Sequence, residues 1–286
     1  MSLKQSLKVA LIQFAAGADK AANIATVTSK VAEAASNGAK LVVLPECFNS
    51  PYAVSAFPKY AEKIPGGETT TALSDLAKKH NLFLVGGSYP ESDAGKVYNT
   101  SVAFSPSGDI ISKHRKLHLF DIDVPGKITF KESETLTGGD KITLFDMEGY
   151  GKIGLGICYD IRFPEVAATA ARKGAFAMIY PGAFNTTTGP LHWHLLARAR
   201  AVDNQVYVIA CSPAQDLNSG YHAFGHSLVS DPLGKIIAEA DVDETVVYAE
   251  LEPAELAAAR QNIPVGTQRR FDAYDDVSKT AKVSAV

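Results

Sequence analysis

The stretch KIGLGICYDIRFPEVAATAARKG, residues 152–174, decides the fold class because its pattern changes near Cys158. Between Lys152 and the cysteine every residue is apolar or glycine, which is typical of a buried strand. From Pro164 onward the sequence is rich in alanine, and proline suits the first turn of a helix. We therefore predict a strand, a sharp corner and a helix, which is the building block of an α/β protein.

The N-terminal part of the chain repeats this alternation of strand and helix. Residues 7–14 (LKVALIQF), 39–46 (AKLVVLPE) and 82–87 (LFLVGG) are predicted to be strands. Apolar residues between the first two strands recur at helical spacing: Ile24, Val27, Val31 and Ala34. A second helix is predicted over about residues 69–80, directly before the third strand.

Two further segments have the pattern of β-hairpins. Residues 96–114 (KVYNTSVAFSPSGDIISKH) and 226–240 (HSLVSDPLGKIIAEA) each contain two strand-like runs joined by a turn with proline and glycine. Hairpins imply antiparallel neighbours within mixed sheets. Because no Pro/Gly/Ser-rich linker separates these units, we predict that residues 1–286 form a single α/β domain of two sheets with helices outside.

The composition limits the classes of partner. The 286 residues are 46% hydrophobic and 21% charged, which is typical of a globular chain with a large core. A formal net charge of −3 provides no basic field for nucleic acid. We therefore expect a small-molecule partner, with no nucleic acid and no membrane.

The cysteine count and the N-terminus bear on the compartment. Three cysteines do not form a disulfide framework, and none has the spacing of a structural zinc site. The opening MSLKQSLKVALIQF has too short an apolar run for a signal peptide or a membrane span, and it lacks the arginines of a mitochondrial presequence. We expect a mature cytoplasmic chain from the first residue, and a mitochondrial pool remains an alternative.

Cys158 is the first candidate for a catalytic residue. A strand-to-helix corner can present a nucleophile, glycines there let a substrate approach, and backbone amides beyond it can face a developing oxyanion. The alternative is a structural role, since free cysteine is among the most buried residue types.

Three charged residues are further candidates. Glu46 directly follows an apolar strand, Lys116 ends the cationic run HRK, and Glu132 lies in the polar segment TFKESETLTGGD, residues 129–140. Carboxylates at the end of a strand can hold a ligand at the edge of an α/β sheet. The alternatives are a solvated strand end for Glu46, a wet cationic face for Lys116 and a solvent-exposed loop for Glu132.

The order of these motifs is more specific than any one of them. LPE, HRK, a glutamate loop and GxCYDxRFPE together resemble the nitrilase superfamily of carbon–nitrogen hydrolases, and the resemblance continues through AVDNQVYV to RQNIPVGTQRRFDAY. It implies that Cys158 is the nucleophile, Glu46 the general base and Lys116 the oxyanion stabiliser, with Glu132 a second carboxylate near the lysine. All four positions are present, which disfavours a non-catalytic scaffold of the same fold.

The resemblance also implies an architecture. The family fold is a four-layer α-β-β-α sandwich with mixed sheets, in agreement with the two-sheet prediction. Family members usually pair through helices, so we expect a homodimer. The C-terminal tail, about residues 262–286, is placed at a subunit contact as a hypothesis.

Within the family, CFNSPY, GICYDIRFPE and AVDNQVYV are most similar to the ω-amidase branch. This similarity implies hydrolysis of 2-oxoglutaramate, and of succinamate, to the dicarboxylate and ammonia through a cysteine thioester, without a cofactor. A sister activity on deaminated glutathione is the nearest alternative.

Two residues are candidates for substrate binding. Arg162, four residues after Cys158, could pair with a substrate carboxylate in bidentate fashion, and the alternative is an ion pair with Glu165 or Asp160. Tyr52 lies in the loop after Glu46 and could line the pocket that binds the substrate. The alternative is a packing role, which is more common for an aromatic residue in a proline-containing loop.

Histidines form two closely spaced pairs, His192 with His194 and His222 with His226. A zinc site must therefore be considered. The first pair lies in HWHLLARARA, which reads as an ordinary helix, and no cysteine or carboxylate completes either pair at a convincing spacing. We therefore predict no metal site.

Overall fold

The computed structural model describes residues 2–126 and 128–284 of the chain. Its helices are α1 (Lys20–Ser36), α2 (Phe57–Tyr60), α3 (Glu68–His80), α4 (Pro164–Arg172), α5 (Gly189–Asn204) and α6 (Pro253–Asn262), with short 3₁₀ helices η1 (Glu132–Glu134) and η2 (Cys158–Arg162). Its strands are β1 (Leu7–Gln13), β2 (Leu41–Val43), β3 (Phe83–Val85), β4 (Tyr89–Asp93), β5 (Lys96–Phe104), β6 (Ile110–Arg115), β7 (Asp121–Val124), β8 (Ile128–Lys131), β9 (Thr143–Met147), β10 (Gly151–Leu155), β11 (Ala175–Pro181), β12 (Tyr207–Cys211), β13 (Leu228–Ser230), β14 (Ile236–Glu239) and β15 (Thr245–Leu251).

The first sheet comes from the N-terminal half of the chain and one late strand. Its order is β15-β1-β2-β3-β5-β4, with β6 paired to β5. The strands β1, β2 and β3 run parallel, whereas β15 and the hairpin β5–β6 pair antiparallel. The sheet is therefore mixed, as the hairpin pattern predicted.

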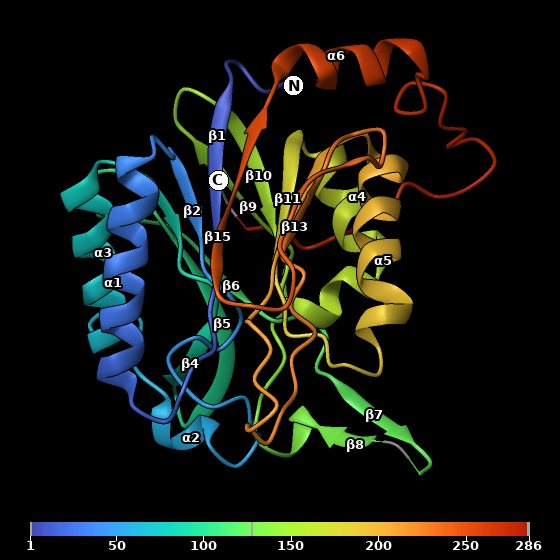
Figure 1. Cartoon of the computed structure of the whole chain (residues 1–286). Coiled ribbons are helices and arrows are strands. Elements are labelled where there is room, and N and C mark those ends of the chain that lie inside the picture. The colour runs from blue at the N-terminus through green and yellow to red at the C-terminus, as the bar shows by residue number, and fades with distance from the viewer. Residues whose placement is uncertain (1, 127, 285–286) are drawn as a thin grey trace.

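The second sheet has the order β14-β13-β12-β11-β10-β9. Its centre is parallel, from β10 through β11 to β12, and antiparallel strands occupy both flanks. The predicted hairpin at 226–240 forms β13 and β14 at one edge. A separate two-stranded hairpin, β7–β8, projects from the lower end of the molecule (Figure 1).

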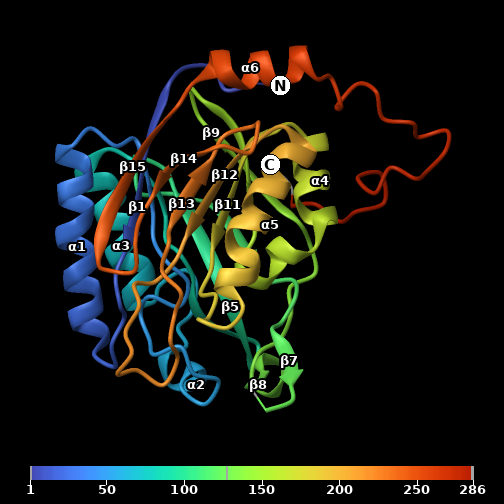
Figure 2. The same ribbon diagram turned by 45° about the vertical axis from the view of Figure 1, so that its right-hand side comes forward.

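The two sheets lie between two helical layers, as Figures 1 and 2 show. Helices α1 and α3 cover the outer face of the first sheet, and α4 and α5 cover the outer face of the second. This arrangement confirms the predicted four-layer α-β-β-α sandwich. Among the described residues, no helix is both long and apolar enough to cross a membrane.

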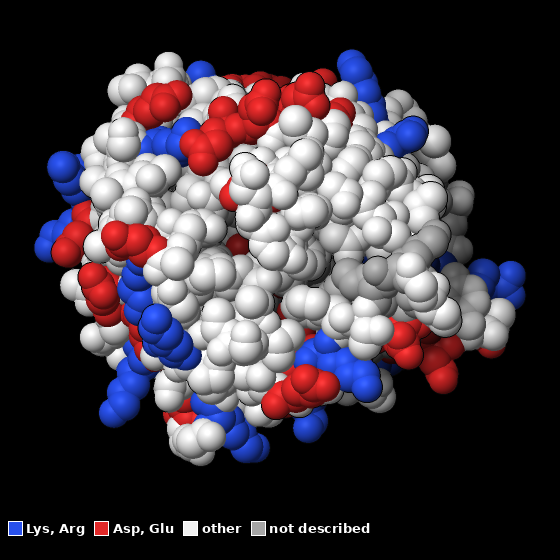
Figure 3. Space-filling model, turned by 60° about the horizontal axis from the view of Figure 1, so that its bottom comes forward, with Lys and Arg blue, Asp and Glu red and all other residues white. Residues whose placement is uncertain are grey.

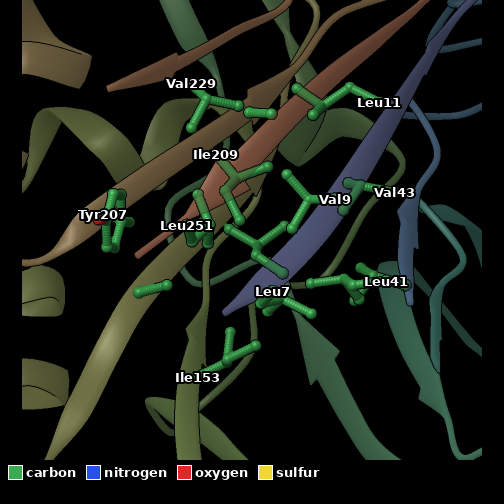
Figure 4. Packing of buried hydrophobic residues seen from close by; sticks show 14 of the residues in the cluster. Leu7, Val9, Leu11, Leu41, Val43, Ile153, Tyr207, Ile209, Val229 and Leu251 are labelled. Atoms are coloured by element: carbon green, nitrogen blue, oxygen red, sulfur yellow. The ribbon is translucent and has the colours of Figure 1, made fainter. Parts of the chain in front are cut away.

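Alternation along β1 shows why its sequence is apolar on both faces. Leu7, Val9 and Leu11 point into the core between the sheets, where they meet Ile209 and Val229 from the second sheet (Figure 4). The intervening residues Ala10 and Ile12 pack under the outer helices instead. Because successive side chains point to opposite faces, the middle of β1, which is buried on both faces, is apolar.

The C-terminal tail follows α6 and returns along the outside of the second sheet (Figures 1 and 2). Asp276 forms an ion pair with Arg172 of α4 at 3.2 Å. Farther on, Val283 forms a parallel bridge with Ile142, just before β9. The tail is thus attached to its own chain, and its predicted role in a subunit contact remains a hypothesis. Residues 285 and 286 lie outside the described residues.

Candidate active site

Four buried side chains predicted from separate motifs meet at one end of the sandwich. Glu46 follows β2, Lys116 follows β6, Glu132 opens η1 and Cys158 opens η2. The Lys116 Nζ lies 3.0 Å from Glu46 Oε1 and 2.9 Å from Glu132 Oε1, with all three side chains fully buried. The structure therefore brings the predicted set together and rejects the wet-face and exposed-loop alternatives.

Glu46 is held by donors from several segments. Asn99 Nδ2 donates to its Oε1 at 2.9 Å, and the Ala183 amide donates to its Oε2 at 2.7 Å. Burial raises the pKa of Glu46 above its ordinary value despite the opposing effect of the Lys116 ammonium. The result is a fixed carboxylate with increased affinity for a proton.

Glu132 holds the other side of the lysine. Its Oε2 accepts the Phe120 amide at 2.7 Å, and its Oε1 accepts the hydroxyl of Tyr52 at 3.1 Å as well as Lys116. Burial alone would lower the pKa of Lys116, but the charges of Glu132 and Glu46 raise it well above its ordinary value. The two carboxylates therefore favour the ammonium form of the lysine.

Cys158 stands at the predicted corner between β10 and α4. Its backbone is left-handed, with φ of 45°, and only 3% of the residue is exposed. The pKa of the thiol is raised well above its ordinary value, mainly by burial and next by the negative charge of Glu46. The positive charge of Lys116 only partly offsets this increase. Burial and the nearby carboxylate therefore both favour the neutral thiol form of Cys158.

Asp160 is a positioning residue that the sequence analysis treated only as a partner for Arg162. Its carboxylate accepts the Ile157 amide and the His118 amide, each at 2.9 Å, and the His114 ring at 3.0 Å. These hydrogen bonds lower the pKa of the fully buried carboxyl in spite of the opposing burial. Asp160 thus ties the segment carrying Lys116 to the corner carrying Cys158.

Arg162 has neither of the acidic partners that were considered for it. Among the described residues, no ion pair with a carboxylate involves this guanidinium. Its Nη1 lies 3.2 Å from His192 Nδ1, its head lies 4.7 Å from the ring centroid of Phe184, and its Nε is buried without a hydrogen-bond partner. Burial lowers the pKa of Arg162. The alternative that was considered for Arg162, an ion pair with Glu165 or Asp160, is therefore not formed.

A cavity of about 890 Å³ opens beside Glu46 and Cys47. Tyr52 and Tyr221 line it, with ring centroids 4.4 Å apart, and Phe130 of β8 stacks on Tyr52 at 5.8 Å. Figure 3 looks onto this end of the molecule, where uncharged residues cover the middle and most charged residues lie near the margin. The cavity is large enough to give a small amide access to the buried carboxylate of Glu46.

Tyr52 does more than pack, because its hydroxyl contacts both carboxylates, at 3.4 Å from Glu46 and 3.1 Å from Glu132. Sequence reasoning missed Tyr221, whose hydroxyl donates to the Ala183 carbonyl, and Asn99. A run of three polar residues, Asn99 to Ser101, inside a predicted strand is a signal that could have been noticed for Asn99. No comparable signal marks Tyr221 in its loop.

Comparisons with known proteins place these motifs in a wider context. A sequence model described as carbon-nitrogen hydrolase matches residues 8–261. Omega-amidase NIT3 of Saccharomyces cerevisiae is 56% identical over 284 residues, covering 96% of this chain and 97% of the relative. Omega-amidase NIT2 of Homo sapiens is 54% identical over 269 residues, covering 94% and 97%.

A solved structure agrees with these sequence relatives. The crystal structure of Saccharomyces cerevisiae Nit3, described as a member of branch 10 of the nitrilase superfamily, superposes with a TM-score of 0.87 at 53% identity. The match covers 94% of this chain and 98% of that chain. The resemblance inferred from the motifs is therefore confirmed, together with the fold that it implied.

Proposed function

The chain belongs to the carbon–nitrogen hydrolase family and hydrolyses amides, and we propose that it is an ω-amidase acting on 2-oxoglutaramate and succinamate. The observation that carries this proposal is the fully buried pairing of the Lys116 ammonium with both Glu46 and Glu132, next to the buried thiol of Cys158. The named activity of the similar proteins supports the choice of substrate.

Acylation begins from a neutral thiol. As the Cys158 sulfur attacks the amide carbon, its proton passes to the nearby Glu46 carboxylate, whose pKa burial has raised. The carbonyl oxygen becomes negative, and the buried Lys116 ammonium stabilises it. When the tetrahedral intermediate collapses, Glu46 returns the proton to the departing nitrogen, so ammonia leaves and a thioester remains on Cys158.

Deacylation reuses the same base. Glu46, again a carboxylate, takes a proton from water as the water oxygen attacks the thioester carbonyl. Collapse of the second intermediate releases the new carboxylic acid, and the proton held by Glu46 returns to the Cys158 sulfur. Glu132 acts as a positioning residue, because it fixes the lysine and keeps it charged.

Arg162 is assigned to the substrate carboxylate. A guanidinium that is half-buried, lies against aromatic rings and lacks an acidic partner among the described residues is suited to a bidentate carboxylate from outside the chain. Tyr52 is assigned to the wall of the amide pocket, next to Glu46.

The test is Arg162→Lys, which keeps the charge and removes the planar fork. We expect KM for 2-oxoglutaramate to rise about tenfold or more, and turnover of a neutral short amide to change little. Arg172→Lys, at the remote ion pair with Asp276, is the control. Equal losses on charged and neutral amides would remove Arg162 from the binding role. Release of a dipeptide from deaminated glutathione in clear preference to ammonia from 2-oxoglutaramate would replace the ω-amidase assignment.

We also propose that the cytoplasmic form is a homodimer formed through α5. Three large apolar side chains of this helix, at spacings that share one face, are exposed: Leu191 (64%), Leu195 (61%) and Val202 (47%). Three free cysteines support a reducing compartment. Leu195→Glu should yield a monomer in sedimentation experiments, whereas Ile110→Glu on the first sheet should not. A monomeric wild type would refute the homodimer.

A further inference from the structure

A second cluster of titratable side chains lies between α5 and the β13–β14 hairpin, outside the cavity that contains Glu46. The two histidine pairs in the sequence do not converge as pairs. Instead His194 of α5 and His226, just before β13, meet Glu239 at the end of β14. A carboxylate therefore completes a ligand set that sequence spacing alone did not reveal, because the β13–β14 hairpin returns it beside α5.

The three donor atoms converge on one region. His194 Nε2 lies 2.6 Å from Glu239 Oε1, and His226 Nδ1 lies 3.1 Å from the same oxygen. All three ligand atoms lie within 4.8 Å of one another, and the side chains are between 22% and 33% exposed. Within the described part of the chain, no other group of three such residues meets this distance condition.

The backbone around His226 is specifically arranged for this position. His226 has a left-handed φ of 57°, which is unfavourable for a residue with a Cβ. Its carbonyl accepts the Trp193 indole N–H at 2.7 Å, and its amide donates to the Asp241 carbonyl at 3.1 Å. The Phe224 ring lies 4.4 Å from that of His226 and 6.0 Å from that of His194. Both imidazoles are therefore supported by packing as well as by hydrogen bonds.

We propose that His194, His226 and Glu239 bind one Zn²⁺ ion. Two imidazole nitrogens and a carboxylate oxygen form a donor set that zinc accepts, whereas calcium and magnesium prefer oxygen alone. Ligand bonds of about 2.0–2.1 Å place neighbouring donors of a tetrahedron roughly 3.3 Å apart. The two donor separations seen here need only small side-chain movements to reach this value, and water supplies the fourth position.

The ion would link α5 to the β13–β14 hairpin. It does not enter the proposed reaction, because the cluster lies outside the cavity that contains Glu46. The other ring nitrogen of His226, Nε2, lies 4.0 Å from Asp241 Oδ1, so a carboxylate faces the ring from the side away from the ion. Such outer partners of metal-bound histidines orient the ring and increase its basicity.

The experiment is a competition titration of Zn²⁺ against a chromophoric chelator with the full-length protein. We expect one tight site per chain in the wild type. His226→Ala and Glu239→Gln should each weaken this site about tenfold or more. His222→Ala is the matched control, because His222 is an exposed histidine of the same loop outside the cluster, and this variant should bind as the wild type does.

A second measurement distinguishes loss of the zinc site from loss of folding. Zinc should raise the melting temperature of the wild type and of His222→Ala, but not that of Glu239→Gln, whose circular dichroism should match the wild type. Unchanged zinc affinity in both cluster variants would overturn the proposal. If Cys158→Ala were the only variant to lose the tight zinc site, the metal would be assigned to the active-site thiol instead.

Discussion

At the scale of single residues, burial determines which groups of the proposed active site hold a proton. Glu46 and Cys158 both have raised pKa values, chiefly because burial disfavours their charged forms. Lys116 keeps its charge because two carboxylates outweigh the effect of its own burial. A neutral thiol beside a basic carboxylate can then transfer its proton during attack instead of before it.

Lys116→Ala tests the proposed oxyanion contact. An interaction that is strongest in the transition state contributes to kcat, so kcat should fall about a hundredfold or more while KM changes little. Steady-state measurement of ammonia release gives both constants. An increase confined to KM would instead make Lys116 a ground-state binder of substrate.

The pH dependence of kcat/KM tests the base. Glu46 accepts the thiol proton only when ionised, so activity should be lost as pH falls through a pKa that lies above 4.5. Tyr52→Phe removes a hydroxyl that donates to this carboxylate and should move the acidic limb to higher pH. Circular dichroism at each pH separates titration from unfolding. An unchanged limb in Tyr52→Phe would argue that another group controls it.

Motif order identified the four proposed catalytic residues, but sequence could not predict their supporting contacts. The Ala183 amide donates a hydrogen bond to Glu46, although the two residues are 137 positions apart in the sequence. The hydroxyl of Tyr221, in a loop, donates to the carbonyl of the same Ala183. Such contacts depend on how two sheets pack, and local periodicity carries no information about that packing. Arg162 illustrates the same limit, because nearby acidic residues in sequence were not neighbours of its guanidinium in space.

At the scale of elements, the corner between β10 and α4 depends on Asp160. This carboxylate joins the strand end at Ile157 to His114 and His118, which flank Lys116. The strand and the helix were predicted from their periodicity. The intervening 3₁₀ helix η2, the short hairpin β7–β8 and η1 were not, since elements of three to five residues carry too little pattern to recognise.

Asp160→Asn should lower the free energy of unfolding by about 2 kcal/mol or more, because hydrogen bonds to a buried charge are lost. The pKa of Asp160 is depressed in the folded state, so its contribution is complete above the ordinary value of 3.8 and declines as pH falls below it. The stability gap between wild type and variant should therefore narrow in acid. Denaturant unfolding at several pH values measures the gap.

The control for this variant is Asp146→Asn, on the exposed part of β9, which should leave both stability and activity close to those of the wild type. A stability gap for Asp160→Asn that widened as pH fell would contradict the depressed pKa. A variant as stable as the wild type would show that the corner is held by other contacts.

At the scale of the whole molecule, the two sheets form a rigid support for loops that carry the chemistry. Hairpins and strand–helix units in the sequence predicted the sheets and their outer helices, and the family resemblance predicted their stacking. The path of the C-terminal tail could not be predicted, because its contacts with α4 and with Ile142 join segments that are remote in sequence. The convergence of His194, His226 and Glu239 was hidden for the same reason.

Removal of metal separates the two proposals about this molecule. Exhaustive dialysis against a chelator should leave ammonia release unchanged, because every proposed step uses only side chains of the chain itself. The same treatment should abolish the zinc-dependent gain in melting temperature. Activity that disappeared on chelation and returned with zinc would show that the proposed zinc site, or another metal site, is needed for turnover.

The central claim is that Cys158 is the nucleophile, and the rate of ammonia release by Cys158→Ala tests it most directly. With Cys211→Ala as the matched control for a buried cysteine in the core, both variants should remain folded. We predict that Cys158→Ala loses turnover of 2-oxoglutaramate by about a thousandfold or more while its melting temperature stays close to that of the wild type. Turnover at the wild-type rate in this folded variant would contradict the account.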